Sequence, residues 1–97
     1  MAAAHQRFRP APGVLFTPID DQLAALISTE RTLPYSLNAT GLVVWRTLES
    51  GAGLEQIVAA LTGEFDICED QARQDTEAFL RDLLAFELIE RAERTDP

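Results

Sequence analysis

Apolar residues in the first part of the chain recur in patterns that predict three β-strands. Residues 14–19 are rich in β-branched and aromatic side chains, and residues 23–29 place apolar side chains on alternating faces. The polar residues 20–22 between them are typical of a turn, so the two segments predict a hairpin. A third strand is expected over residues 32–37. Its residue Pro34 cannot donate a backbone hydrogen bond, which places this strand at the edge of the sheet.

The second part of the chain predicts three helices. Asn38 is an expected N-cap for a helix over about residues 39–49, which ends before the glycines of residues 50–53. Apolar residues at helical spacing from Leu54 to Phe65 predict the second helix. The third begins at Glu69, because acidic residues favour the positive end of a helix. Strands followed by helices predict an α+β fold, a winged-helix-like domain with a three-stranded antiparallel sheet followed by three helices.

One domain accounts for this chain of 97 residues, which leaves little room for a deep catalytic cleft. We expect the domain to span residues 14–91. Residues 1–13 have no periodic apolar face and are expected to form a flexible N-terminal tail, and residues 92–97 a fraying C-terminus.

Charge and composition exclude several classes of function. Sixteen acidic residues against eight arginines give a net charge of -8, which disfavours a nucleic-acid partner. No apolar stretch has the length of a membrane span or of a secretory signal, so we expect a cytoplasmic protein with no membrane partner. The single Cys68 and single His5 match no zinc-site spacing, and we expect no metal or cofactor. Without a nucleophile constellation or a phosphate-binding loop, we expect no enzyme.

A family resemblance is carried by ordered motifs along most of the chain. The segment 35–45 opens a helix with Leu37-Asn38 and bears Trp45, and it precedes a glycine turn. The remaining matching positions are Ile57, Val58, Leu61, Asp75, Phe79, Leu80, Leu83, Leu88 and Ile89. Over residues 14–91 the chain resembles the pyrroloquinoline quinone biosynthesis protein D (PqqD-like) family, the peptide-binding module also called the RiPP recognition element.

The resemblance implies a non-catalytic adaptor. It would bind the leader segment of a ribosomally made precursor peptide and present the peptide to a modifying enzyme, such as a radical SAM enzyme or a leader peptidase. The leader would add as a strand to the third strand, with its side chains in a groove against the third helix. The implied peptide-binding residues are Arg31, Thr32, Leu33, Pro34, Tyr35 and Ser36 on the strand, and Ala72, Arg73, Asp75, Thr76, Phe79, Leu80 and Leu83 on the helix.

Several alternatives stay open at this point. A helix packed on a sheet must bury one face, so two of Phe79, Leu80 and Leu83 are expected in the core and the third in the groove. The small residues Ala72 and Thr76 could leave space for the peptide or serve close helix packing.

Pro34 could serve only to prevent aggregation at the edge. Arg31 and Arg73 could pair with acidic leader residues or remain solvated. The segment before Leu37 lacks the acidic and glycine pattern of members that make pyrroloquinoline quinone itself, so a lasso-peptide or other modified-peptide pathway fits at least as well. A winged-helix DNA-binding regulator and a self-pairing homodimer are the competing functions, although a third helix with six acids and two arginines opposes DNA binding.

Overall fold

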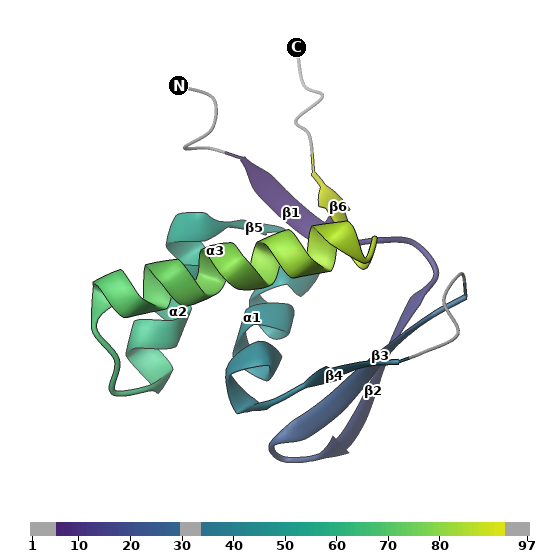
Figure 1. Cartoon of the computed structure of the whole chain (residues 1–97), viewed down its shortest axis with the longest axis horizontal. Coiled ribbons are helices and arrows are strands. Elements are labelled where there is room, and N and C mark those ends of the chain that lie inside the picture. The colour runs from purple at the N-terminus through teal and green to yellow at the C-terminus, as the bar shows by residue number, and fades with distance from the viewer. Residues whose placement is uncertain (1–5, 30–33, 93–97) are drawn as a thin grey trace.

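A computed structural model describes residues 6–29 and 34–92 of the chain. The order of its elements is β1 (Arg7–Pro10), β2 (Val14–Asp20), β3 (Leu23–Ser28), β4 (Tyr35–Leu37), α1 (Ala39–Glu49), β5 (Ala52–Gly53), α2 (Leu54–Glu64), α3 (Glu69–Ala85) and β6 (Ile89–Arg91). The strands form two antiparallel three-stranded sheets, and α3 lies across the other two helices (Figure 1). This confirms the α+β fold class with three helices.

The predicted hairpin and edge strand form one of these sheets. β3 lies at its centre, between β2 and β4. The turn between β2 and β3 is closed by the Asp20 carboxylate, which accepts a hydrogen bond of 2.7 Å from the backbone N–H of Gln22. β4 has no partner strand on its outer side among the residues that the structure describes, as expected for a strand that follows Pro34.

The second sheet corrects the prediction that residues 1–13 form a flexible tail. Residues Arg7–Pro10 form the central strand β1, which pairs with β5 on one side and with β6 on the other. Phe8 is buried in the core, and the guanidinium of Arg7 donates to the Gly51 carbonyl oxygen at 2.6 Å. These partners lie more than 40 residues away in sequence, so no local pattern could reveal the strand.

Gly53 allows β1 and β5 to pack closely, and Gln56 ties this pair of strands to α2. Gly53 lies opposite Arg7 in the ladder, and a Cβ at this position would lie 2.6 Å from the carbonyl oxygen of Gln6. Any side chain there would push the strands apart. The Gln56 side chain accepts from both the Gly53 N–H and the Arg7 guanidinium, so the start of α2 is tied to β1.

Caps at the helix ends determine how α1 and α3 meet the sheets. The Asn38 side chain accepts from the Gly41 N–H at 2.9 Å, which confirms the predicted N-cap. At the end of α3, Glu87 has a φ of 60°, and the following Leu88 N–H donates to the Leu83 carbonyl oxygen at 2.9 Å. This is a Schellman turn, and it directs the chain from α3 into β6.

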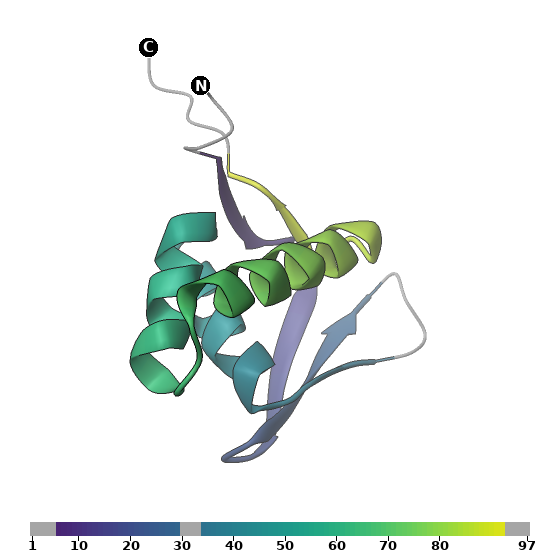
Figure 2. The same cartoon turned by 60° about the vertical axis from the view of Figure 1, so that its left-hand side comes forward.

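The core lies between the helices and the inner faces of both sheets. Its largest side chain, Trp45, is buried in α1, and α2 packs against both α1 and α3. Other fully buried residues come from every helix and include Leu48, Ile57, Leu61 and Leu83. Figure 2 shows the β2-β3-β4 sheet beside α3, and the Tyr35 side chain of β4 packs against the Phe79 side chain of α3.

Candidate peptide-binding groove

An open strand edge borders the candidate site. Thr29 donates its backbone N–H to the Gly13 oxygen at 3.3 Å, so this position of the strand faces β2. Backbone groups alternate between the two sides of a strand, so Leu26, three residues earlier, faces β4. Its partner Tyr35 faces β3 in return. Ser36 therefore points its backbone N–H and carbonyl off the open edge.

A groove of about 540 Å³ lies beside this edge. Its walls come from β4, from the start of α1 and from the middle of α3. The lining residues are Leu23, Tyr35, Ser36, Asn38, Thr40, Gly41, Val44, Asp75 and Phe79. Apolar side chains form its floor, and amide, hydroxyl and carboxylate groups stand among them. Such a groove suits an extended peptide whose backbone pairs with β4 while its side chains enter the groove.

Aromatic rings form the wall between β4 and α3. The Tyr35 ring lies 6.1 Å from the Phe79 ring and 5.4 Å from the Phe86 ring, measured between centroids, with tilted planes. Gly41 brings α1 close to this wall, since a Cβ there would lie 3.3 Å from the Phe79 ring. Burial raises the pKa of the Tyr35 hydroxyl, and the nearby Asp82 carboxylate raises it further.

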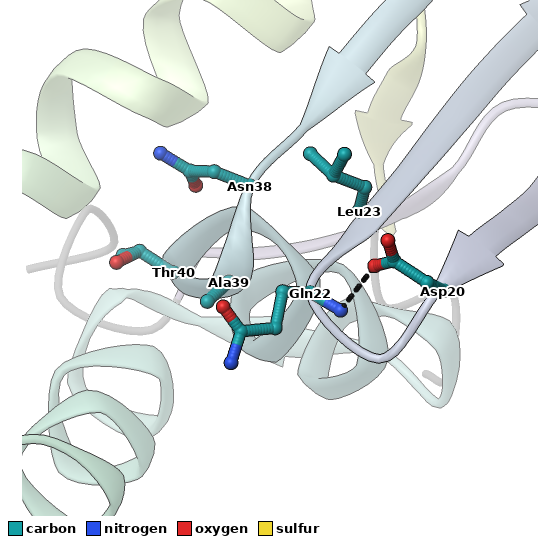
Figure 3. A pocket seen from close by; sticks show the side chains of 6 residues that line it. All are labelled: Asp20, Gln22, Leu23, Asn38, Ala39 and Thr40. Atoms are coloured by element: carbon teal, nitrogen blue, oxygen red, sulfur yellow. Dashed lines mark hydrogen bonds between the residues drawn. The ribbon is translucent and has the colours of Figure 1, made fainter.

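A second cavity continues the groove towards the turn between β2 and β3. It has a volume of about 450 Å³ and shares Leu23, Asn38 and Thr40 with the first. Figure 3 shows that its side chains come from this turn and from the start of α1, with the Asp20 carboxylate turned to the backbone of Gln22. The two cavities together extend well beyond the three residues of β4.

The structure places the predicted strand residues at this site where it describes them. Tyr35 and Ser36 line the groove, and Pro34 is exposed directly before β4. Arg31, Thr32 and Leu33 lie outside the described residues. On α3, Asp75 and Phe79 line the groove. Their contact with a peptide stays a prediction.

Five other predicted helix residues lie elsewhere. Ala72, Thr76 and Leu83 are fully buried and Leu80 is 6% exposed, so these four side chains belong to the core. For Ala72 and Thr76, this burial corrects the prediction that they face the groove. For Leu80 and Leu83 it agrees with the expectation that two of the residues Phe79, Leu80 and Leu83 belong to the core, and Phe79 is the one that lines the groove. The Thr76 hydroxyl is buried without a hydrogen-bond partner among the described residues.

Arg73 is the fifth of these residues. Its guanidinium binds the Glu55 carboxylate of α2 and, at 2.8 Å, the Glu69 carboxylate one turn earlier in α3. The hydrogen bond from Arg73 lowers the pKa of the Glu55 carboxyl, and the two carboxylates raise the pKa of Arg73. This side chain ties α2 to α3 and does not line the groove.

Sequence reasoning missed five residues that line the groove, and two further residues, Phe86 and Asp82, that act on Tyr35 without lining it. Asn38 was identified only as a helix cap, although the cap lies where strand, helix and cavity meet. Thr40, Gly41 and Val44 line the groove from the first turns of α1. Leu23 reaches it from β3. Phe86 and Asp82 could have been found from their spacing, because each lies seven residues after Phe79 and Asp75, which is two helical turns.

Comparisons with known proteins agree with this arrangement. A family model described as Coenzyme PQQ synthesis protein D (PqqD) matches residues 24–89, more than half of the chain. The chain belongs to the PqqD family. The matched region runs from β3 to the start of β6, so it includes the open edge and every residue that lines the groove except Leu23. The comparison with curated proteins gave no match.

A solved structure extends the likeness beyond the PqqD region. It is described as TbiB1 in complex with the TbiA(beta) leader peptide, and the two chains are 30% identical with a TM-score of 0.77. The alignment covers 91% of this chain and 99% of TbiB1.

Neither a membrane-spanning helix nor a metal-binding cluster is found among the described residues. None of their helices is long and apolar enough to cross a membrane. No group of three or more histidine, cysteine, aspartate or glutamate side chains in that part of the chain could hold a metal ion.

Proposed function

We propose that this PqqD-family protein is a RiPP recognition element, a non-catalytic adaptor for a precursor peptide. The leader segment of a ribosomally made precursor adds to the open edge of β4 as a further strand, and its side chains enter the groove against α3. The adaptor then presents the precursor to a modifying enzyme or a leader peptidase. The single observation that carries this proposal is the unpaired β4 edge beside the groove.

The comparisons support the same proposal. TbiB1, which shares the fold and 30% of its residues, was solved with a leader peptide. In this chain, strand addition would use the backbone N–H and carbonyl of Ser36, since Tyr35 and Leu37 pair with β3. Pro34 would offer only its carbonyl. An added strand of this kind obtains affinity from main-chain hydrogen bonds and specificity from the groove.

A titration followed by amide-resolved NMR tests the proposal. The ligand is the TbiA(beta) leader peptide, which was solved in complex with TbiB1. We expect saturable shifts in residues 34–37 and around Asp75 and Phe79, and protection of the Ser36 N–H from hydrogen exchange. A DNA duplex at low salt should leave the spectrum unchanged, because phosphates are repelled by the acidic surface.

Matched variants separate backbone pairing from other contacts. Ser36→Pro removes one outward N–H and should weaken leader binding about fivefold, which corresponds to about 1 kcal/mol. Ser36→Ala keeps that N–H and should bind like the parent. Leaders with N-methyl groups on the amides that face β4 should fail to bind, while methylation of the alternate amides is tolerated. Equal binding by Ser36→Pro and by both methylated peptides would contradict strand addition.

A further inference from the structure

We propose that the groove selects leader peptides that carry a basic side chain close to an apolar one. This inference rests on the proposed function and names the chemistry of the peptide that the site accepts. The resemblance alone left open whether Arg31 and Arg73 recognise acidic leader residues. The groove itself has the opposite charge.

Both charged residues that line the two joined cavities are carboxylates. Asp75 stands in the wall beside β4, and Asp20 stands at the far end, in the turn before β3. The Asp75 carboxylate accepts a hydrogen bond of 2.9 Å from the Gln71 side-chain amide, which is neutral and leaves the negative charge in place. A cation bound there would gain a charge-assisted hydrogen bond that a neutral side chain cannot form.

A third carboxylate continues the same face of α3. Asp82 follows Asp75 by seven residues, which is about 10 Å along the helix axis. It lies close enough to Tyr35 to raise the pKa of the phenol, so its charge acts on the aromatic wall. Side chains on one face of an extended peptide recur every two residues, about 6.6 Å apart. Basic residues two or four positions apart can therefore approach both carboxylates.

In the part of the chain that the structure describes, no arginine side chain neutralises the two cavities. Arg73 is held by Glu55 and Glu69, and Arg9 is held by Glu90 at 2.7 Å. The Arg7 guanidinium donates to Gly51 and Gln56 near β1. No arginine among the described residues lines either cavity.

Aromatic and acidic groups together explain why one ligand residue should be basic and its neighbour apolar. Lysine and arginine place their methylene stems on apolar surface while the charged end reaches a polar rim. The faces of Tyr35 and Phe79 also attract cations. An apolar ligand side chain would cover the floor, and the adjacent base would reach Asp75 or Asp82.

Selection from a yeast-displayed library of random peptides of about twelve residues tests this inference without knowledge of the natural leader. The baits are the parent, Asp75→Asn/Asp82→Asn, Ser36→Pro, and Glu77→Gln as a matched control. The amide oxygen that Asp75→Asn introduces would still accept from Gln71, so the local structure is kept. Glu77 lies on a different side of α3, beside Phe8 and Leu54, and controls for a general change of charge.

The parent should enrich lysine and arginine at constant spacing from an apolar residue. The double variant should lose the basic preference and keep the apolar one, and Glu77→Gln should behave like the parent. For a resynthesised peptide, replacing the base by norleucine should weaken binding to the parent about three- to tenfold, with little effect on the double variant. Added salt should reduce the difference.

Two results would overturn the inference, and one of them leaves the function standing. The carboxylates do not select the ligand if the selected peptides depend on Ser36 but carry no excess of basic residues. The same conclusion follows if the double variant keeps that excess, or if Glu77→Gln loses it as well. The strand-adding adaptor would still be supported. If no peptide is retained in a manner that Ser36→Pro weakens, the proposed function itself fails, and the inference fails with it.

Discussion

The two edges of the β2-β3-β4 sheet differ in length, in proline position and in what lies beside them. β4 is three residues long, follows Pro34 and borders a groove with an aromatic wall. β2 is seven residues long and has Pro18 within it. The pairing of Leu15 with Ile27 turns the backbone of Pro18 towards the open side, where its ring replaces an N–H.

Side chains along β2 also differ from those at β4. Leu15 is 59% exposed and Ile19 is 64% exposed, and no cavity described above is lined by either. A long apolar strand without a blocked edge would be a template for aggregation. At β4 the outward position is Ser36, and the adjacent groove supplies side-chain selectivity. The β4 edge can bind a peptide selectively because a groove lies beside it. Among the described residues no such groove lies along the β2 edge, and Pro18 there removes a backbone donor that could pair with another strand.

Removal of the wall should have the largest effect. Phe79→Ala deletes a half-buried ring that contacts Tyr35, so we expect the free energy of unfolding to fall by about 2 kcal/mol and leader affinity to fall more than about tenfold. Urea unfolding and calorimetric titration measure the two quantities. Leu15→Ala at the other edge is the control, and it should change neither by more than about 0.5 kcal/mol. Equal effects at both edges would remove the distinction between them.

The core position behind the wall should affect stability alone. Thr76→Val replaces a buried hydroxyl that lacks a partner among the described residues, and it should raise the free energy of unfolding by about 1 kcal/mol. Leader affinity should stay the same, because this side chain does not line the groove. If leader affinity changes while the free energy of unfolding does not, Thr76 belongs to the binding site and not to the core alone.

Restoring an N–H at the other edge should produce a weak effect. Pro18→Thr gives β2 an outward donor between exposed apolar side chains, so the variant should self-associate more strongly than the parent, with a dissociation constant on the order of 1 mM. Sedimentation at increasing protein concentration measures this. If the variant and the parent sediment alike, Pro18 is not what blocks the edge.

The smallest expected effect is a shift in the titration of Tyr35. Because it is the only tyrosine, its ultraviolet absorbance reports this group directly. The pKa should lie above 10, since burial and Asp82 both disfavour the phenolate. Asp82→Asn should lower this pKa, because it removes one of the two causes of the shift. As the folded-state pKa is the higher one, stability should be lost as the pH rises through it.

Local signals were sufficient for the helices and for one sheet. Asn38 marked the start of α1, the glycines after Glu49 marked its end, and the acids at Glu69 marked the start of α3. The alternating residues 23–29 indicated one strand of a hairpin, and Pro34 within the predicted strand 32–37 indicated an edge strand, of which the structure describes Tyr35–Leu37 as β4. Each of these signals acts within a few residues, so it is visible in sequence.

Features that depend on distant partners could not be predicted. β1 has one buried apolar residue, Phe8, and its partners β5 and β6 have only two and three residues. In the groove, Asp75 and Phe79 were identified through the family resemblance, and the structure places both in the lining. The assignment of Leu83 to the core instead depends on the rotation of α3 about its axis, which the packing of all three helices determines.

The pairing of β1 with β6 has a consequence for the order of folding. Phe8 lies opposite Arg91, so a strand near the start of the chain pairs with one that is synthesised some eighty residues later. Closing a loop of that length carries an entropic cost before the contact contributes stability. On the ribosome, β5 can pair with β1 earlier, through Phe8 and Ala52, but the β6 side of β1 stays unpaired until nearly the whole domain has emerged. We therefore expect the β2-β3 hairpin and the helices to form first, with the pairing of β1 and β6 last.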